Sequence, residues 1–236
     1  TLKTKPISIG SIPAMLWGEP SDQLILTVHG NQSSKTDVPI EILAQEATSL
    51  GFQVLSFDLP EHGERKNEPE PCNTQTCKRD LLAVLAFAVP KYKEISLFAC
   101  SMGAYFSMLT FADELFQRCL FLSPVVDMLH IIQNMMRWAQ VSEEQLEQER
   151  EIVTAFGPTL YWDYYQTVKA NPITRWNTPT SILYGAKDEL CAKEDVTSFA
   201  ERFHCDLQIA ENAEHYFHTE EDLSVYRDWL KRHLSA

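Results

Sequence analysis

Short apolar runs that alternate with helical segments constrain the fold of this chain most. The runs are apolar on both faces, as expected of buried strands, and they occupy residues 24–28, 54–57, 95–98, 120–122, 181–184 and 207–209. Segments with helical spacing of apolar residues separate them, and the first of these, residues 40–50, stops at Gly51, a favourable residue just after a helix end. This alternation predicts an α/β fold, with a mainly parallel central sheet and helices on both faces.

One strand is followed by a turn with a distinctive sequence. Ala99-Cys100-Ser101-Met102-Gly103 comes directly after the run 95–98 and before a segment predicted to be helical through Leu115. A serine with small residues two positions away on each side, between a buried strand and a helix, is typical of a nucleophile elbow. Ala99 fills a position where glycine is commoner. The tight turn would expose the Ser101 hydroxyl at the carboxyl edge of the sheet.

A serine hydroxyl becomes a good nucleophile when a base takes its proton and a carboxylate orients that base. The sequence offers both groups after Ser101, each just beyond a strand. Asp188 follows the run 181–184, and His215 follows the run 207–209. Because the carboxyl ends of parallel strands share one edge of the sheet, we expect Ser101, Asp188 and His215 to meet there.

Other residues compete for the roles of acid and base. Asp127 follows the strand at 120–122, and Asp195 begins a helix, where a carboxylate is favoured by the helix dipole. His218 lies one helical turn after His215. We favour Asp188 and His215 because of their positions directly after strands.

Residues 129–178 interrupt the alternation. They contain no convincing strand and three segments with helical character. The first is rich in Met and aliphatic residues. The second begins at Ser142 with Gln145 three residues later, a capping-box signature, and stops before Gly157. The third is aromatic and stops before Asn171.

An all-helical insert after the strand at 120–122, the sixth in the count of a hydrolase-like sheet, predicts a cap over the edge where ligands bind. The alternative is a set of packing helices remote from any site. We therefore divide the chain into a core of residues 1–128 and 179–236 and a small helical cap, or lid, of residues 129–178. Met and aromatic side chains make adaptable apolar surfaces, so a substrate pocket wall is expected from Met135, Trp138, Tyr161, Trp162 and Tyr165. Packing of the lid against the core explains the same residues equally well.

The chain resembles the α/β-hydrolase superfamily over essentially its whole length. Its motifs are His29-Gly30 after the strand at 24–28 (the third in the superfamily's count), the segment Asp58–Gly63 after the strand at 54–57 (the fourth), the elbow, and the Gly-x-x-Asp and histidine loops. The segment Asp58–Gly63 is similar to the Asp-x-x-Gly-His-Gly motif of that superfamily, with Glu61 in place of the first glycine. With its small helical cap, this set of motifs most resembles that of carboxylesterases, acyl esterases and lysophospholipase-like serine hydrolases.

The resemblance implies an α/β-hydrolase fold and a serine hydrolase acting on small-molecule carboxylic esters or thioesters of small to medium acyl chains. It implies a Ser101–His215–Asp188 triad, with His29 and His62 bracing loops around it. The expected oxyanion hole uses the backbone N–H groups of Met102 and Asn31. Neither a metal nor an organic cofactor is expected. A peptidase, a thioesterase or a lyase with the same triad is the alternative among enzymes, and a ligand-binding protein on this scaffold is the alternative outside them.

Composition excludes several partners. A net charge of −13 argues against nucleic acid and anionic membranes, and no apolar stretch approaches the roughly 20 residues of a membrane span. Of the six cysteines, Cys100 and Cys119 lie in strands, which favours reduced thiols and a cytoplasmic location. Cys72 and Cys77 could hold a metal or form a disulfide, but no second ligand pair has zinc spacing. Cys100 is one residue from the apex of the elbow and is not expected to be the nucleophile.

Overall fold

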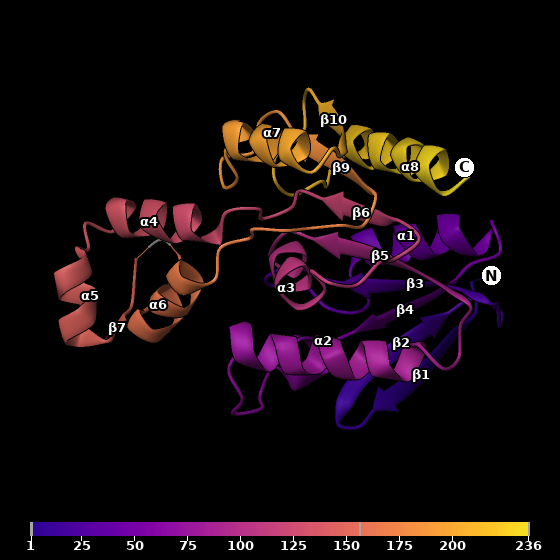
Figure 1. The fold of residues 1–236 in the computed structure, drawn as a ribbon, viewed down its shortest axis with the longest axis horizontal. Coiled ribbons are helices and arrows are strands. Elements are labelled where there is room, and N and C mark those ends of the chain that lie inside the picture. Colours follow the sequence, from indigo (N-terminus) through magenta and orange to yellow (C-terminus); the bar gives the residue numbers. More distant parts are fainter. Residues whose placement is uncertain (1, 156, 236) are drawn as a thin grey trace.

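The computed structural model describes residues 2–155 and 157–235, and an eight-stranded sheet forms its centre (Figure 1). The strand order is β1-β2-β4-β3-β5-β6-β9-β10. The strands are β1 (Thr4–Ile9), β2 (Ile12–Trp17), β3 (Gln23–Val28), β4 (Gln53–Phe57), β5 (Glu94–Cys100), β6 (Cys119–Leu122), β9 (Thr180–Gly185) and β10 (Asp206–Ala210). From β4 to β10 all neighbours are parallel, whereas β2 is antiparallel to both β1 and β4. The mainly parallel sheet is confirmed, and the β1–β2 hairpin is an addition that the sequence patterns did not predict.

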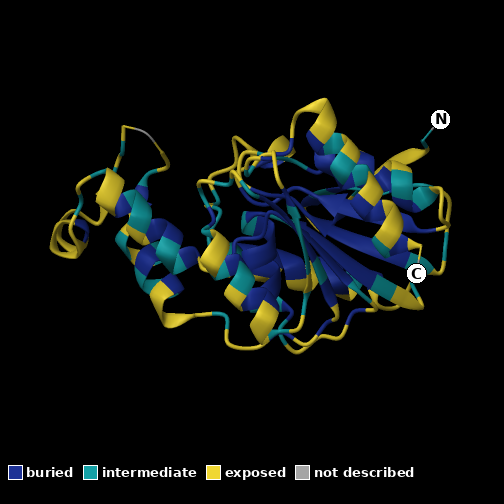
Figure 2. Cartoon of the chain, turned by 90° about the horizontal axis from the view of Figure 1, so that it is seen from above, coloured by how far each residue is buried: buried dark blue, intermediate teal, exposed yellow. Residues whose placement is uncertain are grey.

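Helices cover both faces of this sheet, as predicted. Helices α1 (Val38–Thr48) and α8 (Glu220–Leu234) pack on one face. The other face carries α2 (Thr74–Ala88), α3 (Met102–Thr110) and α7 (Lys193–Arg202). Figure 2 shows the strands as the buried layer between these helices.

The two faces of β3 show why the sheet needs cover on both sides. Leu24, Leu26 and Val28 contribute to the apolar cluster beneath α2 and α3, and Ile25 between them contributes to the cluster beneath α1 and α8. All four side chains are fully buried. Successive side chains of a strand point to opposite faces, so a strand with apolar side chains on both faces must be covered twice.

Helix α3 is shorter than predicted. It ends at Thr110, where Phe111 leaves the helical conformation, and the expected helical residue Leu115 lies beyond it with an exposed side chain. A single-turn 3₁₀ helix, η1 (Gly63–Arg65), follows β4.

The segment predicted to be an all-helical cap contains helices and a small sheet. Its helices are α4 (Met128–Trp138), α5 (Glu143–Glu149) and α6 (Trp162–Ala170), and β7 (Glu151–Ile152) pairs antiparallel with β8 (Leu160–Tyr161). The prediction of helix up to Gly157 was therefore wrong. Arg150 adopts a φ of 67°, which ends α5 and turns the chain into the extended backbone of β7.

These elements form a lobe at one end of the molecule, joined to the sheet after β6 and before β9 (Figure 1). Ser142 begins α5 as expected, since its hydroxyl accepts a hydrogen bond from the Gln145 N–H at 3.1 Å. We retain the division into a core of residues 1–128 and 179–236 and a cap of residues 129–178 as a proposal.

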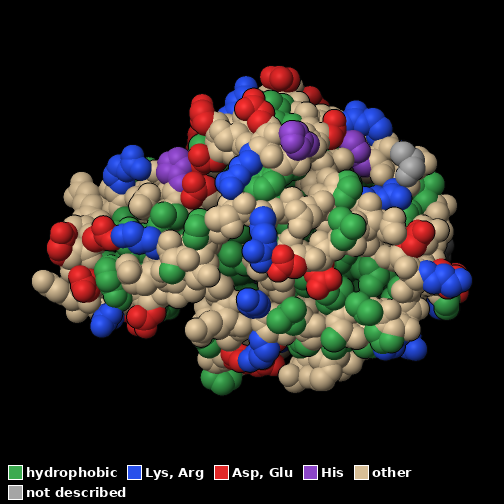
Figure 3. Space-filling model, in the orientation of Figure 1, with side chains coloured by type: hydrophobic (Ala, Val, Ile, Leu, Met, Phe, Trp, Pro, Cys, Tyr) green, Lys and Arg blue, Asp and Glu red, His purple; other side chains and the backbone are tan. Residues whose placement is uncertain are grey.

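Acidic and basic side chains are interspersed over the face of the molecule in Figure 3. Among the helices of the described residues, none is long and apolar enough to cross a membrane.

Candidate active site

Three polar side chains meet at the carboxyl edge of the sheet. Ser101 follows β5, Asp188 lies in the turn after β9, and His215 lies in the loop after β10. The Ser101 Oγ is 2.8 Å from the His215 Nε2, and the His215 Nδ1 is 2.7 Å from the Asp188 Oδ2. The structure thus brings together the three residues that the sequence pattern selected.

The turn at Ser101 has the strained backbone expected of an elbow. Ser101 adopts a φ of 52° and a ψ of −119°, a conformation that non-glycine residues rarely adopt. Gly103 is required for a different reason. A Cβ atom there would lie 2.4 Å from the His29 carbonyl oxygen and 2.6 Å from that of Val28, so α3 can approach β3 this closely only with glycine.

Backbone groups hold Asp188 in place. Its side chain is fully buried, and its Oδ1 accepts hydrogen bonds from the N–H groups of Leu190 and Cys191, both at 2.8 Å. These bonds leave Oδ2 facing His215. Because the His215 Nε2 faces the Ser101 hydroxyl, we assign the proton to Nδ1, which then donates to Asp188.

Ser123 is a positioning residue that the sequence patterns did not reveal. It follows β6 with a φ of 48°, and its hydroxyl donates to the His215 carbonyl oxygen at 2.8 Å. This bond ties the histidine loop after β10 to the end of β6, across β9. A serine directly after a strand and before Pro124 was the available signal, but the partner lies 92 residues away in the chain.

The competing acids and the competing histidine lie elsewhere. Asp127 caps α4 by accepting from the His130 N–H, and the Asp195 Oδ2 is 2.5 Å from the His130 Nδ1. Both acids therefore contact His130. The exposed His218 has its Nδ1 2.8 Å from the Tyr216 carbonyl oxygen.

The donor chemistry of two groups within the described residues suits a metal ion. One is Asp127, His130 and Asp195, and the other is Asp188, Cys191 and His215. In the second group the Asp188 and His215 atoms already bind each other.

Cys100 directly precedes Ser101 in the chain. Burial raises the pKa of its thiol to about 12, so the thiol stays protonated at neutral pH.

His29 braces the loop that follows β3. Its Nε2 accepts from the Leu59 N–H at 3.0 Å, so its Nδ1 donates to the Gly30 carbonyl oxygen at 2.7 Å. Burial lowers the pKa of His29 to about 4, which keeps the ring neutral at physiological pH. A neutral ring is the form that can accept one of these bonds and donate the other.

His62 holds the same loop from the other side. Its Nε2 accepts from the Gln32 N–H at 3.1 Å, and its Nδ1 lies 2.8 Å from the Pro60 carbonyl oxygen. Asn31, a candidate oxyanion donor, therefore lies between two anchored residues. Met102, the other candidate, is the first residue of α3, where the helix itself provides no acceptor for the backbone N–H.

Asp58 anchors the segment that carries His62. It is fully buried and accepts hydrogen bonds from the Lys35 N–H at 2.9 Å, the Lys35 ammonium at 2.7 Å and the Glu64 N–H at 3.0 Å. A Cβ at Gly63 would lie 2.2 Å from the Asp58 Oδ1. Glu61, which replaces the glycine of the similar motif, has a φ of 66°, a conformation that favours glycine.

A cleft of about 960 Å³ opens above Ser101. The core contributes mainly polar residues to it: Asn31, Glu61, His62, Cys72, Asn73, Thr74 and Gln75. The segment 125–167 contributes mainly apolar side chains, among them Val125, Met128, Ile131, Ile132, Met135, Leu160, Tyr161 and Tyr164. Within the described residues, Thr74 Oγ1 and Gln166 Nε2 are buried polar atoms of this wall that lack a hydrogen-bond partner.

Two of the five predicted wall residues, Met135 and Tyr161, line this cleft. Trp138, Trp162 and Tyr165 do not. Trp138 is 62% exposed near the end of α4, and Tyr165 is buried against Trp162 with its ring centroid 6.0 Å away.

The lining residues of α4 share one face of that helix. Met128, Ile131, Ile132 and Met135 have the spacing of i, i+3, i+4 and i+7, which places them along one stripe. This spacing was the sequence signal that could have identified them, and Trp138 belongs to the next turn, where the helix leaves the cleft.

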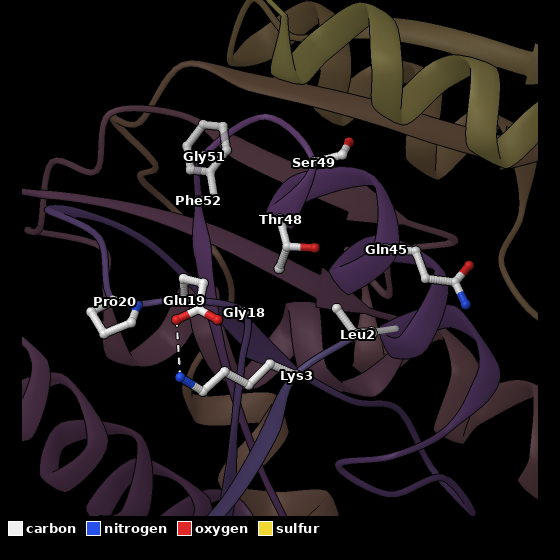
Figure 4. A pocket seen from close by; sticks show the side chains of 10 residues that line it. All are labelled: Leu2, Lys3, Gly18, Glu19, Pro20, Gln45, Thr48, Ser49, Gly51 and Phe52. Carbon is white, nitrogen blue, oxygen red and sulfur yellow. Dashed lines mark hydrogen bonds and ion pairs between the residues drawn. The ribbon is translucent and has the colours of Figure 1, made fainter.

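A second cavity of about 460 Å³ lies between the β2–β3 turn and the end of α1 (Figure 4). The Lys3 ammonium and the Glu19 carboxylate form an exposed ion pair of 2.9 Å beside it. It lies at the end of the sheet where β3 begins, whereas Ser101 follows the end of β5. It therefore has no part in the site around Ser101.

Comparison with solved structures identifies the fold. The chain is similar to Est1E from Butyrivibrio proteoclasticus with ferulic acid bound (19% identity, 98% of each chain covered, TM-score 0.77). It is also similar to alpha/beta hydrolase domain-containing protein 10 from mouse (13% identity, 99% and 98% covered, TM-score 0.79) and to the Pyrococcus furiosus esterase Pf2001 (17% identity, 100% and 89% covered, TM-score 0.67). The chain therefore has the α/β-hydrolase fold, as predicted. No protein-family model and no curated protein sequence matches it.

Proposed function

We propose that this protein is a serine hydrolase that cleaves carboxylic esters or thioesters through an acyl-enzyme on Ser101. The observation that carries the proposal is the continuous path of hydrogen bonds from Ser101 through His215 to Asp188 at the floor of a large cleft. The esterases among the structural neighbours support the same class of reaction.

In the first step, His215 removes the proton of the Ser101 hydroxyl while the oxygen attacks the substrate carbonyl. The Nε2 that takes the proton is within hydrogen-bond distance, as general base catalysis requires. The imidazolium that forms is stabilised by the buried Asp188 carboxylate. The developing oxyanion is bound by the N–H groups of Met102 and Asn31, each worth about 3–4 kcal/mol in such sites.

In the second step, His215 donates its proton to the departing alcohol or thiol, leaving the acyl group on Ser101. A water molecule then attacks the acyl-enzyme with His215 again acting as the base, and Ser101 is regenerated. No step of this mechanism requires a metal or an organic cofactor.

The composition of the cleft supports a substrate of small to medium size with an apolar acyl group. The side contributed by α4 is apolar, and the volume of about 960 Å³ is of the size typical for small ligands. Ferulic acid, which Est1E binds, has this combination of properties.

The test is hydrolysis of p-nitrophenyl esters from acetate to palmitate, together with methyl ferulate, by the wild type and Ser101→Ala. We expect turnover in the wild type, loss of at least about 10³-fold in the variant, and labelling of Ser101 by a fluorophosphonate probe. Ser107→Ala is the matched control, because Ser107 is a buried serine of α3 that bonds the Gly103 carbonyl oxygen and does not line the cleft.

If Ser101→Ala hydrolysed these esters as fast as the wild type does, the proposal would be contradicted. Probe labelling without turnover of any ester would indicate peptide, thioester or lyase chemistry at the same residues. Neither turnover nor labelling would favour a ligand-binding protein on this scaffold.

A further inference from the structure

Two cysteines lie side by side where α2 begins. The Sγ atoms of Cys72 and Cys77 are 3.5 Å apart. Between them, Asn73 caps the helix by accepting from the Thr76 N–H at 3.0 Å, and the Thr76 hydroxyl accepts from the Asn73 N–H at 3.1 Å. In such a capping box, the residue before the cap packs against the fourth residue of the helix. Here both of those residues are cysteines, so the helix cap itself brings the two thiols together.

The two thiols differ in access. Cys72 is half-buried and lines the cleft above Ser101, whereas Cys77 is fully buried under the first turn of α2. A reagent in the cleft therefore meets Cys72 first, and Cys77 can react only with the sulfur of Cys72.

The electrostatic surroundings also differ. A hydrogen bond from the Cys77 thiol holds the pKa of Cys72 below its usual range, against the opposing effects of burial and of Glu61. The interaction with Cys72, together with burial, raises the pKa of Cys77 well above its usual range. One thiolate beside one thiol is the arrangement needed for a nucleophilic cysteine and a resolving cysteine.

We propose that Cys72 and Cys77 form a redox-active dithiol that exchanges with low-molecular-weight disulfides such as oxidised glutathione. In the first step, the Cys72 thiolate attacks one sulfur of the disulfide, forming a mixed disulfide and releasing one thiolate. In the second step, Cys77 loses its proton and attacks the Cys72 sulfur, forming the Cys72–Cys77 disulfide and releasing the second small thiol. The two cysteines lose two electrons in total, and the small disulfide gains them.

The position of the pair links its state to the cleft. Cys72 also donates its backbone N–H to the Glu61 carboxylate at 2.7 Å, and Glu61 and His62 line the same wall. Closing the disulfide shortens the distance between the two sulfur atoms from 3.5 Å to about 2.05 Å and removes the Cys72 thiol from the wall of the cleft. The pair is a modification site in the cleft wall, and its chemistry does not depend on the proposed hydrolase activity.

The test is mass spectrometry of the native protein after incubation with oxidised glutathione, acid quenching, unfolding and alkylation. Trypsin releases residues 67–78 as one peptide, between Lys66 and Lys78, and this peptide contains Cys72 and Cys77 and no other cysteine. We expect the wild-type peptide to lose two hydrogen atoms and both alkylation sites, and to recover both after treatment with dithiothreitol.

Three variants complete the test. Cys77→Ala is expected to retain glutathione on Cys72, because the resolving thiol is missing, and Cys72→Ser is expected to leave Cys77 unmodified. Cys205→Ser is the matched control, since Cys205 is also half-buried but lies outside the cleft. In this variant the 67–78 peptide is expected to oxidise as it does in the wild type. A wild-type peptide that stays alkylated at both cysteines, or that keeps glutathione on Cys72, would overturn the proposal.

Discussion

The core around Ser101 and the segment 129–178 position their side chains by different means. Around Ser101, backbone groups do the positioning: the Val125 N–H binds the Ser101 carbonyl oxygen at 3.1 Å, and the Ser123 hydroxyl binds that of His215. In the segment 129–178, apolar stripes on short helices do it, and ion pairs such as Lys169–Glu143 lie at the surface. Strand register fixes a residue to within one position, whereas an apolar stripe fixes only the face of a helix.

The largest effect on activity is expected from Asp188→Asn, which tests the anchoring of the core site. The amide retains an oxygen for the Leu190 and Cys191 N–H groups, but it presents an NH₂ group to the His215 Nδ1. His215 must then carry its proton on Nε2, where it cannot accept the Ser101 proton. We expect kcat on p-nitrophenyl butyrate to fall by about 10⁴-fold while the thermal unfolding temperature changes little.

Asp127→Asn and Asp195→Asn are the matched controls. Asp127 follows β6, Asp195 lies in the first turn of α7, and both acids contact His130 instead of His215. Each is expected to change kcat by no more than a factor of about two. A loss in either of them comparable with that of Asp188→Asn would show that backbone anchoring of Asp188 does not select the acid.

A second test compares two glycines. At Gly103, in the core, an added Cβ meets backbone oxygens of the neighbouring strand at 2.4 and 2.6 Å, and neither atom can move without shifting β3. At Gly157, in the segment 129–178, the nearest atom would be 3.7 Å away. We expect Gly103→Ala to lower the free energy of unfolding by about 3 kcal/mol and Gly157→Ala to change it by less than about 0.5 kcal/mol.

Urea denaturation followed by circular dichroism measures both values. If Gly103→Ala does not fold, its soluble yield beside that of Gly157→Ala gives the same ranking. Equal losses in the two variants would mean that the close approach of α3 to β3 is not a constraint on the core.

The core could be predicted well from the sequence because strand register fixes each residue to within one position. Runs that are apolar on both faces identified six strands, and the residues directly after them at positions 101, 188 and 215 meet in space. The β1–β2 hairpin was missed because its first strand is largely exposed and lacks a continuous apolar run. Ser123 was missed because its role is a contact with a loop distant in sequence.

The segment 129–178 was predicted less well. Its helical character was recognised, but the β7–β8 pair was not, because two-residue strands leave no pattern. Trp162 and Tyr165 were chosen by residue type, whereas α6 lines the cleft with its other face. Trp138 has the spacing of the α4 stripe, but it is the last residue of that helix and does not line the cleft. A large aromatic residue in a short helix packs against its neighbours or lies in solvent as readily as it lines a pocket.

The smallest expected effect separates two neighbours on α4. Met135 lines the cleft and Trp138, three residues later, is mostly exposed. The variant Met135→Ala removes part of the apolar contact with a long acyl chain, which is worth about 1 kcal/mol. We therefore expect its kcat/KM on p-nitrophenyl octanoate to fall about fivefold. The same variant should leave p-nitrophenyl acetate nearly unaffected, because a two-carbon acyl group does not extend to α4. Trp138→Ala should leave both esters unchanged. If Trp138→Ala lowers kcat/KM on octanoate as much as Met135→Ala does, then the wall of the cleft extends to the end of α4.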